Sequence, residues 1–382
     1  MESICIIANK YPNNIEPTAL VFVQQLVWSL ADLGITCKVI CPLAVNINPE
    51  YFKVPYKTIE ITEKGNKVEV FFPKYIGVGQ AYKILKWRPA KFTTNSFTKA
   101  VLKVVKEFES LPYAFYGHFV TPAGIAAARI GKKYKKPSYL AYGESTTWSI
   151  DNFGKENVKQ ELSSLSGVIS VSSRNKKMLI EQIEMEENKI KVFPNGYRAE
   201  RFFRYDKSEA RRKMGFPDDK FIVGFCGSFD ERKGILRLEK AVEQLDNIYM
   251  VAAGKGKMVP SSSKCIFAQA VNNEDLPYFY SSLDIFVLPT RNEGCCNAII
   301  EAMACGCPII SSDKSFNYDI LDKSNAILID PDNIDEIIKA IEMLKNNKEL
   351  RESMIKNSLI KAEKLTLCER AKAISEYIFK EC

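Results

Sequence analysis

Short apolar runs alternate with amphipathic stretches along the whole chain, and this alternation restricts the fold more than any other feature. The runs of the first half have the length and the β-branched or aromatic composition of buried strands; they are SICIIAN, CKVIC, KVEVFF, YAFYG, SYLAY, GVISV and IKVF. Helical stretches separate several of them, and the clearest is ALVFVQQLVWSLADLG, which stops at Gly34. Apolar strands that alternate with helices predict an α/β fold with parallel sheets covered on both faces.

A second series of the same kind begins near Phe221. Its strand-like runs are FIVGFCG, IYMVAAG, CIFAQ, DIFVLP, PIISS and AILID, with helical stretches between several of them and three more from Asn333 to Cys382. The 382 residues are too many for one ordinary core. We therefore predict two Rossmann-like domains, 1–193 and 194–364, divided at the Pro-Asn-Gly turn that starts at Pro194 and facing each other across a cleft.

Cysteine usage and hydropathy indicate the compartment. The eleven cysteines are scattered, odd in number and mostly inside apolar runs, which is typical of buried reduced thiols. No Cys-x-x-Cys pair exists and the chain has one histidine, so we expect no metal site. No run of 18 or more apolar residues is present, and the first residues do not resemble a signal peptide. We expect a cytoplasmic protein.

The net charge of +8 lies entirely in the first half of the chain. Residues 1–190 carry 25 Lys+Arg and 17 Asp+Glu, whereas residues 191–382 carry 29 of each. From Lys74 to Lys106 there are eight basic residues and no acidic one, interleaved with aromatic side chains. This stretch suits an anionic membrane, a nucleic acid or an acidic substrate, or it is a solvated helix face. No recognition motif supports a nucleic-acid partner.

The stretch RNEGCCNAIIEAMACG places two carboxylates eight positions apart, Glu293 and Glu301. Glu293 lies in the loop that leaves the strand DIFVLP, and Glu301 lies about one turn inside the following helix. The N–H groups at the start of this helix, near Asn297, suit an anion such as a diphosphate. Carboxylates beside a diphosphate suit the hydroxyl groups of a ribose and a sugar. The alternative is that they are a helix cap and a surface charge.

Two further loops have the same character. VGFCGSFDERKG is a strand, a loop containing Gly227, the cations Arg232 and Lys233, and then a helix. Lys233 would neutralise a leaving diphosphate, although a lysine at the start of a helix is usually solvated. AAGKGKM follows another strand and places Gly254 where the backbone can approach a ligand.

These motifs resemble the retaining GT-B glycosyltransferases of family 4. The resemblance is carried by GSFDERKG, AGKGK, VFPNGYRAERF and the Glu-x₇-Glu segment followed by Ala-Met-Ala-x-Gly-x-Pro. It covers essentially the whole chain and is strongest over 190–345. It implies a GT-B fold whose first domain binds the acceptor and whose second domain binds most of an NDP-sugar donor. It also implies transfer with retention and no metal or other cofactor, the NDP-sugar being a substrate. It also implies that the last helix, about 365–382, packs back on the first domain.

The resemblance also implies roles for individual residues. Glu293, Lys233 and His118 are expected to be catalytic, contacting the donor sugar, the phosphates and the transferred sugar respectively. His118 follows the strand YAFYG and matches the segment around the family's active-site histidine, although a lone histidine is more often structural. Glu301 is expected to hold the ribose hydroxyls. The other expected donor-binding residues are Arg232, Gly227, Gly254, Gly294 and Asn297.

The chain departs from the family pattern at three places. Ser228 stands where the family commonly has an arginine, so one phosphate-binding cation is missing and Arg232 is the candidate replacement. Tyr142-Gly143 stands in place of the usual His-Gly, and the first loop, KYPNNIEPTALVF, has no Gly-Gly pair. The first departure bears on catalysis, and the other two bear on the identity of the acceptor and the donor.

We therefore predict a retaining glycosyltransferase that moves a hexosyl group from an NDP-sugar to a saccharide or lipid-linked acceptor, in the synthesis of surface polysaccharide or another glycan. The alternative is a non-catalytic sugar-nucleotide-binding scaffold on the same fold. A nicotinamide-dependent oxidoreductase is disfavoured, because no Gly-x-Gly-x-x-Gly follows the first strand. Since acceptors in this family are often lipid-linked, we also expect Lys74–Lys106 to contact an anionic membrane at its inner face. The cations expected to carry this contact are Lys83, Lys86, Arg88 and Lys91.

Overall fold

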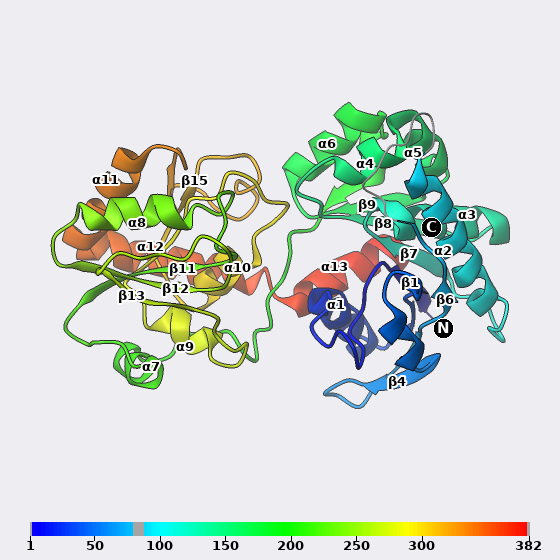
Figure 1. Ribbon diagram of the computed structural model, residues 1–382, viewed down its shortest axis with the longest axis horizontal. Helices are drawn as coiled ribbons and strands as arrows, with labels where there is room; N and C mark the ends of the chain where they lie inside the picture. The colour runs from blue at the N-terminus through cyan, green and yellow to red at the C-terminus, as the bar shows by residue number, and fades with distance from the viewer. Residues whose placement is uncertain (1, 79–87, 380–382) are drawn as a thin grey trace. The chain divides into compact units, whose positions relative to one another are not determined.

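The computed structural model describes residues 2–78 and 88–379 and divides the chain into two compact units. The first unit comprises Met1–Phe193 and Ala371–Cys382, and the second comprises Pro194–Arg370. Each unit is a layered α/β structure with a mainly parallel sheet between helices (Figure 1). The strand-like runs named above all form strands, as the alternation predicted.

The sheet of the first unit has eight strands. In spatial order they are β10 (Ile190–Val192), β9 (Gly167–Ser170), β8 (Ser138–Tyr142), β7 (Ala114–His118), β1 (Ser3–Ala8), β2 (Thr36–Ile40), β5 (Lys67–Phe71) and β4 (Lys57–Ile61). All neighbours pair in parallel except β4, which runs antiparallel to β5. The sequence alternation did not identify this edge strand. A turn at Gly65, with φ +84°, reverses the chain between β4 and β5.

Helices cover both faces of this sheet. They are α1 (Val21–Asp32), α2 (Pro89–Val105), α3 (Ile125–Tyr134), α4 (Trp148–Phe153), α5 (Lys155–Leu162), α6 (Ser173–Ile183) and the end of α13 (Leu367–Phe379). Three short helical turns, η1 (Pro49–Lys53), η2 (Val120–Gly124) and η3 (Glu187–Lys189), and the strand pair β3 (Leu43–Ala44) and β6 (Lys74–Tyr75) complete the unit. Leu30 of α1 and Ile374 of α13 share one core cluster, and Val101 of α2 and Ile130 of α3 share another.

Glu60 of β4 joins the edge strand to the layer of α1. Its carboxylate accepts hydrogen bonds from the Tyr11 hydroxyl at 2.9 Å, the Gln24 amide at 2.8 Å and the Trp28 indole N–H at 2.7 Å. Burial and the neighbouring Glu60 carboxylate raise the pKa of Tyr11 well above its usual value, so the phenol stays a donor. Three donors on one carboxylate fix the hairpin of β4 and β5 against the helix.

The second unit has a six-stranded, wholly parallel sheet. In spatial order its strands are β13 (Cys265–Gln269), β12 (Ile248–Ala253), β11 (Phe221–Cys226), β14 (Ile285–Leu288), β15 (Ile309–Ser312) and β16 (Ala326–Ile329). Its helices are α7 (Lys207–Met214), α8 (Ile235–Glu243), α9 (Leu276–Ser281), α10 (Asn297–Ala304), α11 (Ile334–Asn346) and α12 (Lys348–Glu363). In Figure 1, α8 and α11 lie on one side of this sheet and α9 on the other.

Both sheets reverse their strand order beside their first strand. In the second unit β12 and β13 extend to one side of β11, and β14, β15 and β16 extend to the other. In the first unit β2 and β7 flank β1 in the same way. The loops that leave two such strands at their carboxyl ends diverge and open a crevice, where α/β sheets bind their ligands. The topology thus selects the loops after β11 and β14 in one unit and those after β1 and β7 in the other.

The sequence predicted buried, reduced thiols for the cysteines. The ten cysteines of the described residues are all free thiols, and six of them are buried.

Within the described residues no helix combines the length and the apolar character that a membrane span needs. Lys83, Lys86 and Trp87 of the basic stretch lie outside the described residues. Arg88 donates to the carbonyl of Asp151 at 2.9 Å, and the Lys91 ammonium donates to the Asn157 side chain at 2.8 Å.

Replacement of Glu60 by alanine is expected to destabilise the first unit. The change leaves the Tyr11 hydroxyl and the Trp28 N–H without their acceptor, which costs about 2 kcal/mol in the free energy of unfolding. Urea unfolding followed by tryptophan fluorescence measures the change, and Glu109→Ala, at an exposed position, is the control. Equal unfolding midpoints for the two variants would show that the carboxylate holds nothing in place.

Candidate functional site

The loop after β11 is shaped by close backbone packing and by one aspartate. The Gly227 N–H donates to the Ala253 carbonyl at 3.0 Å. A Cβ on Gly254 would lie 1.9 Å from the Gly227 carbonyl oxygen, so only glycine fits there. One carboxylate oxygen of Asp230 accepts the Lys233 backbone N–H at 2.8 Å, and the other accepts the Ser228 hydroxyl at 2.5 Å. Asp230 therefore fixes the turn that presents Lys233.

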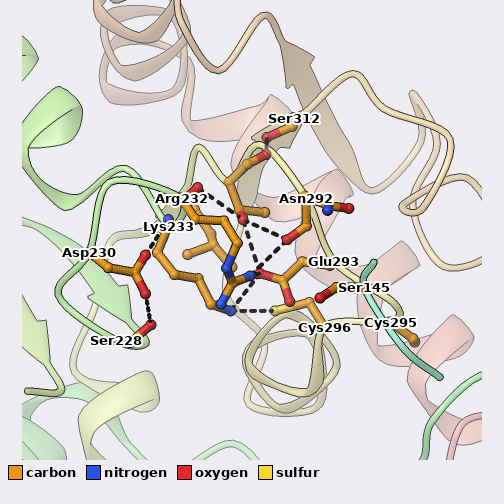
Figure 2. Close-up of polar contacts among 12 residues, drawn as sticks. Ser145, Ser228, Asp230, Arg232, Lys233, Asn292, Glu293, Cys295, Cys296 and Ser312 are labelled. Carbon is orange, nitrogen blue, oxygen red and sulfur yellow. Dashed lines mark hydrogen bonds and ion pairs between the residues drawn. The ribbon is translucent and has the colours of Figure 1, made fainter. Parts of the chain in front are cut away.

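Glu293 is the centre of the loop after β14 (Figure 2). Its Oε1 accepts hydrogen bonds from Arg232 Nη1 at 2.6 Å, Lys233 Nζ at 2.7 Å and the Thr290 hydroxyl at 2.9 Å. The side chains of Lys233 and Glu293 are each 12% exposed, whereas that of Arg232 is 39% exposed. Arg232 also donates to the Asn292 carbonyl at 2.7 Å. The loops on the two sides of the strand-order reversal thus meet in a buried ion cluster.

Arg232, Lys233 and Glu293 together carry one net positive charge, and the carboxylate of Asp230 lies near them: burial works to raise its pKa, but its hydrogen bonds and the two cations lower it. Burial works to lower the pKa of Lys233, but the Cys296 and Glu293 side chains outweigh it and the pKa is raised, so the ammonium keeps its proton. Two cations share the single carboxylate of Glu293, and the remainder suits an anionic ligand. Lys233 Nζ also lies 3.9 Å from the Cys296 sulfur, which places it at the start of α10.

The N-terminus of α10 adds to this positive field. Cys296 occupies the N-cap position without a side-chain cap hydrogen bond. Asn297 is the first helical residue, and its side-chain oxygen accepts the Asn195 amide at 2.8 Å. Gly294 is buried in the loop before it. The first N–H groups of a helix and its dipole attract negative charge, as the sequence suggested for Asn297.

Glu301 lies on the first turns of α10 and has surroundings unlike those of Glu293. Its Oε2 accepts the Tyr280 hydroxyl of α9 at 2.9 Å. Burial raises the pKa of Glu301 to about 7, and the Tyr280 hydrogen bond and the charge of Arg201 oppose the shift only in part. At neutral pH this carboxyl group is therefore close to half protonated.

Sequence reasoning missed the groups that partner the two glutamates. Thr290 and Tyr280 donate to Glu293 and Glu301, and no motif marks either one. Asp230 could have been recognised, because an aspartate three residues before Lys233 at a helix start is a common turn signal. Asn195 belongs to the turn that marked the domain boundary, and it also contacts α10 through Asn297.

His118 belongs to the first unit, whereas the other eight predicted site residues belong to the second. It ends β7, pairs in register with Ala8 of β1 and is 6% exposed. Its ring lies 4.7 Å from that of Phe119 in an edge-on arrangement and 5.5 Å from that of Phe22 on α1. The one histidine of the chain therefore lies at the point where the strand order of the first sheet reverses.

The turn after His118 is strained and held from both sides. Phe119 has φ +72°, a conformation that costs a non-glycine residue about 1–3 kcal/mol and persists only where its surroundings impose it. From the β8 side, Glu144 accepts the Val120 N–H at 3.0 Å. From the β1 side, Asn9 accepts the Ala123 N–H at 3.1 Å. The loops that follow the two strands next to β7 therefore each supply a side chain that positions the turn.

Loss of the Glu144 carboxylate is expected to reorient His118. The chain has one histidine, so its ring signals in a ¹H–¹⁵N NMR spectrum need no assignment. Glu144→Ala removes the acceptor for the Val120 N–H and should shift and broaden these signals. Glu144→Gln keeps an oxygen acceptor and should leave them nearly unchanged. Identical histidine spectra for Glu144→Ala and the wild type would contradict a positioning role.

Known proteins resemble this chain in sequence and in fold. Residues 206–360, which contain the ion cluster and Glu301, match the family model described as glycosyl transferases group 1. A relative with 28% identity over 348 residues is the putative teichuronic acid biosynthesis glycosyltransferase TuaC of Bacillus subtilis. The alignment covers 88% of this chain and 87% of that protein.

Solved structures share the fold over the full length. Sucrose-phosphate synthase from Thermosynechococcus elongatus superposes with a TM-score of 0.75 at 17% identity, covering 100% of this chain and 99% of the other. Anabaena HepE in complex with UDP-glucose superposes with a TM-score of 0.70 at 16% identity, covering 100% of both chains. The family match, the relative and these neighbours agree with the resemblance inferred from the motifs: the chain has the GT-B fold, and residues 206–360 of its second unit match the glycosyl transferases group 1.

Proposed function

We propose that this protein is a retaining, metal-independent hexosyltransferase that uses an NDP-sugar to extend a saccharide or lipid-linked acceptor in the synthesis of surface polysaccharide or a related glycan. The observation that carries the proposal is the buried cluster of Arg232, Lys233 and Glu293 beside the start of α10. Two neighbours support it, since TuaC is named for teichuronic acid biosynthesis and HepE was solved with UDP-glucose.

The nucleoside diphosphate is proposed to bind along the second unit. Lys233, Arg232 and the first N–H groups of α10 hold the two phosphates, because they are the positive groups of the crevice. Gly227 and Gly254 let the backbone approach the ligand without a side chain in between. Glu301 accepts hydrogen bonds from the ribose hydroxyls. Glu293, which holds Arg232 and Lys233 in place, contacts the donor sugar.

In the proposed reaction the acceptor hydroxyl attacks the anomeric carbon on the face from which the diphosphate leaves. The new carbon–oxygen bond forms as the bond to the phosphate oxygen breaks, and the hydroxyl proton passes to the departing phosphate. Lys233 and Arg232 stabilise the charge that develops on the diphosphate, and fixed cations in a buried site do so without reorganising. His118, held by its strained turn, orients the transferred sugar.

Arg232 is proposed to replace the arginine that the family pattern has at position 228. Ser228 donates its hydroxyl to Asp230 and brings no charge to the loop. Arg232 lies one turn later and reaches the same carboxylate as Lys233, so the number of cations near the phosphates is kept.

Contact with an anionic membrane remains part of the proposal for a lipid-linked acceptor. The described part of the basic stretch places an exposed aromatic side chain, Phe92, and several exposed cations on α2. The cations are Lys91, Lys99 and Lys103, with Lys106 at the helix end. A helix with such a face suits the inner surface of the cytoplasmic membrane.

Glu301 gives nucleotide binding an expected dependence on pH. Ribose hydroxyls donate to the ionised carboxylate, so the bound nucleotide lowers a pKa that is about 7 in the free protein. Affinity for UDP or GDP, whichever binds, should therefore rise about tenfold from pH 6 to pH 8, with release of a proton. Calorimetry in buffers of different ionisation enthalpy measures both effects. Glu301→Gln cannot ionise and should flatten the profile; an unchanged slope would remove Glu301 from the ribose site.

The experiment that tests the function is a donor panel. Incubation with NDP-sugars and measurement of nucleoside diphosphate release identify the donor, and the anomeric configuration of the product by NMR decides retention. Lys233→Ala and Glu293→Ala should lower kcat by about 100-fold or more, because each removes a charged contact to the leaving group or the sugar. Lys240→Ala, an exposed lysine of α8, is the control. Wild-type rates in both site variants would mean that the chemistry occurs elsewhere.

A further inference from the structure

A tryptophan stands exposed at the ligand-binding edge of the first unit. Trp148 is the first residue of α4, which follows the loop leaving the carboxyl end of β8, and it is 49% exposed. β8 pairs directly with β7, the strand that ends at His118. Exposure of so large an aromatic side chain forgoes the burial that usually stabilises it, and the place of Trp148 beside the carboxyl end of β8 makes its ring available to a ligand of this edge.

The segment that carries Trp148 is fixed by side-chain hydrogen bonds. The Ser149 hydroxyl donates to the Glu144 carboxylate, and the Thr147 hydroxyl donates to Asp151 at 2.7 Å. The Asn175 amide donates to the Glu144 carbonyl at 2.8 Å. Below the exposed ring, α4 is anchored in the core by its apolar residues. These are Ile150 and Phe153, and both are buried. The indole is thus displayed on a rigid base.

The same carboxylate connects Trp148 to the histidine turn. Glu144 accepts the Ser149 hydroxyl through one oxygen and the Val120 N–H, at 3.0 Å, through the other. Glu144 therefore sets the position of the start of α4 relative to the turn after His118. A ligand that reaches His118 from the carboxyl edge of this sheet has the Trp148 loop beside it.

The chemistry around Trp148 favours an uncharged, hydroxyl-rich ligand. Two threonines precede Trp148 in the chain; the Thr146 hydroxyl oxygen accepts the Trp148 backbone N–H at 3.5 Å, and the Thr147 hydroxyl donates to Asp151. The nearby arginines are directed at backbone carbonyls: Arg88 at that of Asp151, at 2.9 Å, and Arg174 at that of Ser145, at 3.4 Å. An interfacial membrane anchor would pair its aromatic side chain with outward cations. The C–H face of a pyranose instead stacks on the electron-rich face of an indole.

We propose that the indole of Trp148 is a stacking platform for a pyranose ring of the acceptor. In this proposal the loop 143–147 and Trp148 together form an acceptor subsite in the first unit. The proposal rests on the proposed function, in which the acceptor is a saccharide or carries one. It assigns acceptor recognition to a position where the chain departs from its family, immediately after Tyr142-Gly143.

Direct binding tests the platform without any donor. Methyl glycosides of glucose, galactose, N-acetylglucosamine and N-acetylgalactosamine are titrated up to about 100 mM, a range suited to a single stacked ring. The chain has three tryptophans, and Trp28 is hydrogen-bonded to Glu60. At least one glycoside should quench the wild-type emission, and Trp148→Phe should remove this change. Failure of all four glycosides to quench would overturn the proposal.

Kinetics with the identified donor supply the second test. Trp148→Ala should raise the acceptor KM about tenfold or more, the loss of one stacked ring, while Trp148→Phe and Trp148→Tyr stay within about threefold. Affinity for UDP or GDP should be retained in all three, since the donor site lies in the second unit. Phe52→Ala removes another exposed aromatic side chain of the first unit, 68% exposed, and should change neither quantity.

Further results of these experiments distinguish the saccharide platform from a membrane contact and from the failure of the proposed function. An unchanged acceptor KM in Trp148→Ala, with its circular dichroism intact, contradicts the platform. If Trp148→Ala loses binding to anionic vesicles and no glycoside has an effect, Trp148 contacts a membrane and not a saccharide. If Trp148→Ala does not fold, Trp148→Phe and the wild-type titration still decide. Absence of any nucleotide binding by the wild type refutes the proposed function, whereas nucleotide binding without glycoside quenching refutes the platform alone.

Discussion

Parallel strands deliver all their carboxyl ends to one edge of a sheet, and the functional geometry of this chain depends on that constraint. Where the strand order reverses beside the first strand, two successive loops diverge and leave space between them. The loop after β11 carries Arg232 and Lys233, and the loop after β14 carries Glu293, although about 60 residues of sequence separate them. The ion cluster follows from the topology of the sheet together with the residue types at its edge.

The two glutamates of the Glu-x₇-Glu segment are chemically identical, but their different surroundings suit them to different roles. Glu293 receives two cations and a hydroxyl. Glu301, eight positions later, has one phenol for a partner, and burial raises its pKa to about 7. The first is therefore suited to hold cations in place before a ligand arrives. The second is suited to take its charge when hydroxyl donors reach it.

Residue patterns predicted the parts of this molecule that local sequence determines. The run SYLAY forms β8 and CIFAQ forms β13 with the expected bounds, because a buried parallel strand is a short apolar run. The groups that act through distant partners were not predictable in this way. Tyr280 reaches Glu301 from another helix, and Glu144 reaches the turn after His118 from the next strand. Such contacts depend on how segments pack, and no periodicity of the single chain records them.

The helix α13 determines which of the two units can finish folding first. Ile374 and Ile378 of α13 belong to the core cluster of the first unit, and the hydroxyl of Tyr377 on the same helix donates to the Lys189 carbonyl at 2.8 Å. During synthesis the ribosome makes residues 1–193 before residues 194–370, yet part of the apolar core of the first unit stays uncovered until α13 emerges. The unit that is translated first is the one that finishes folding last. A chain that stalls after residue 370 would hold a complete second unit and a first unit that exposes part of its core.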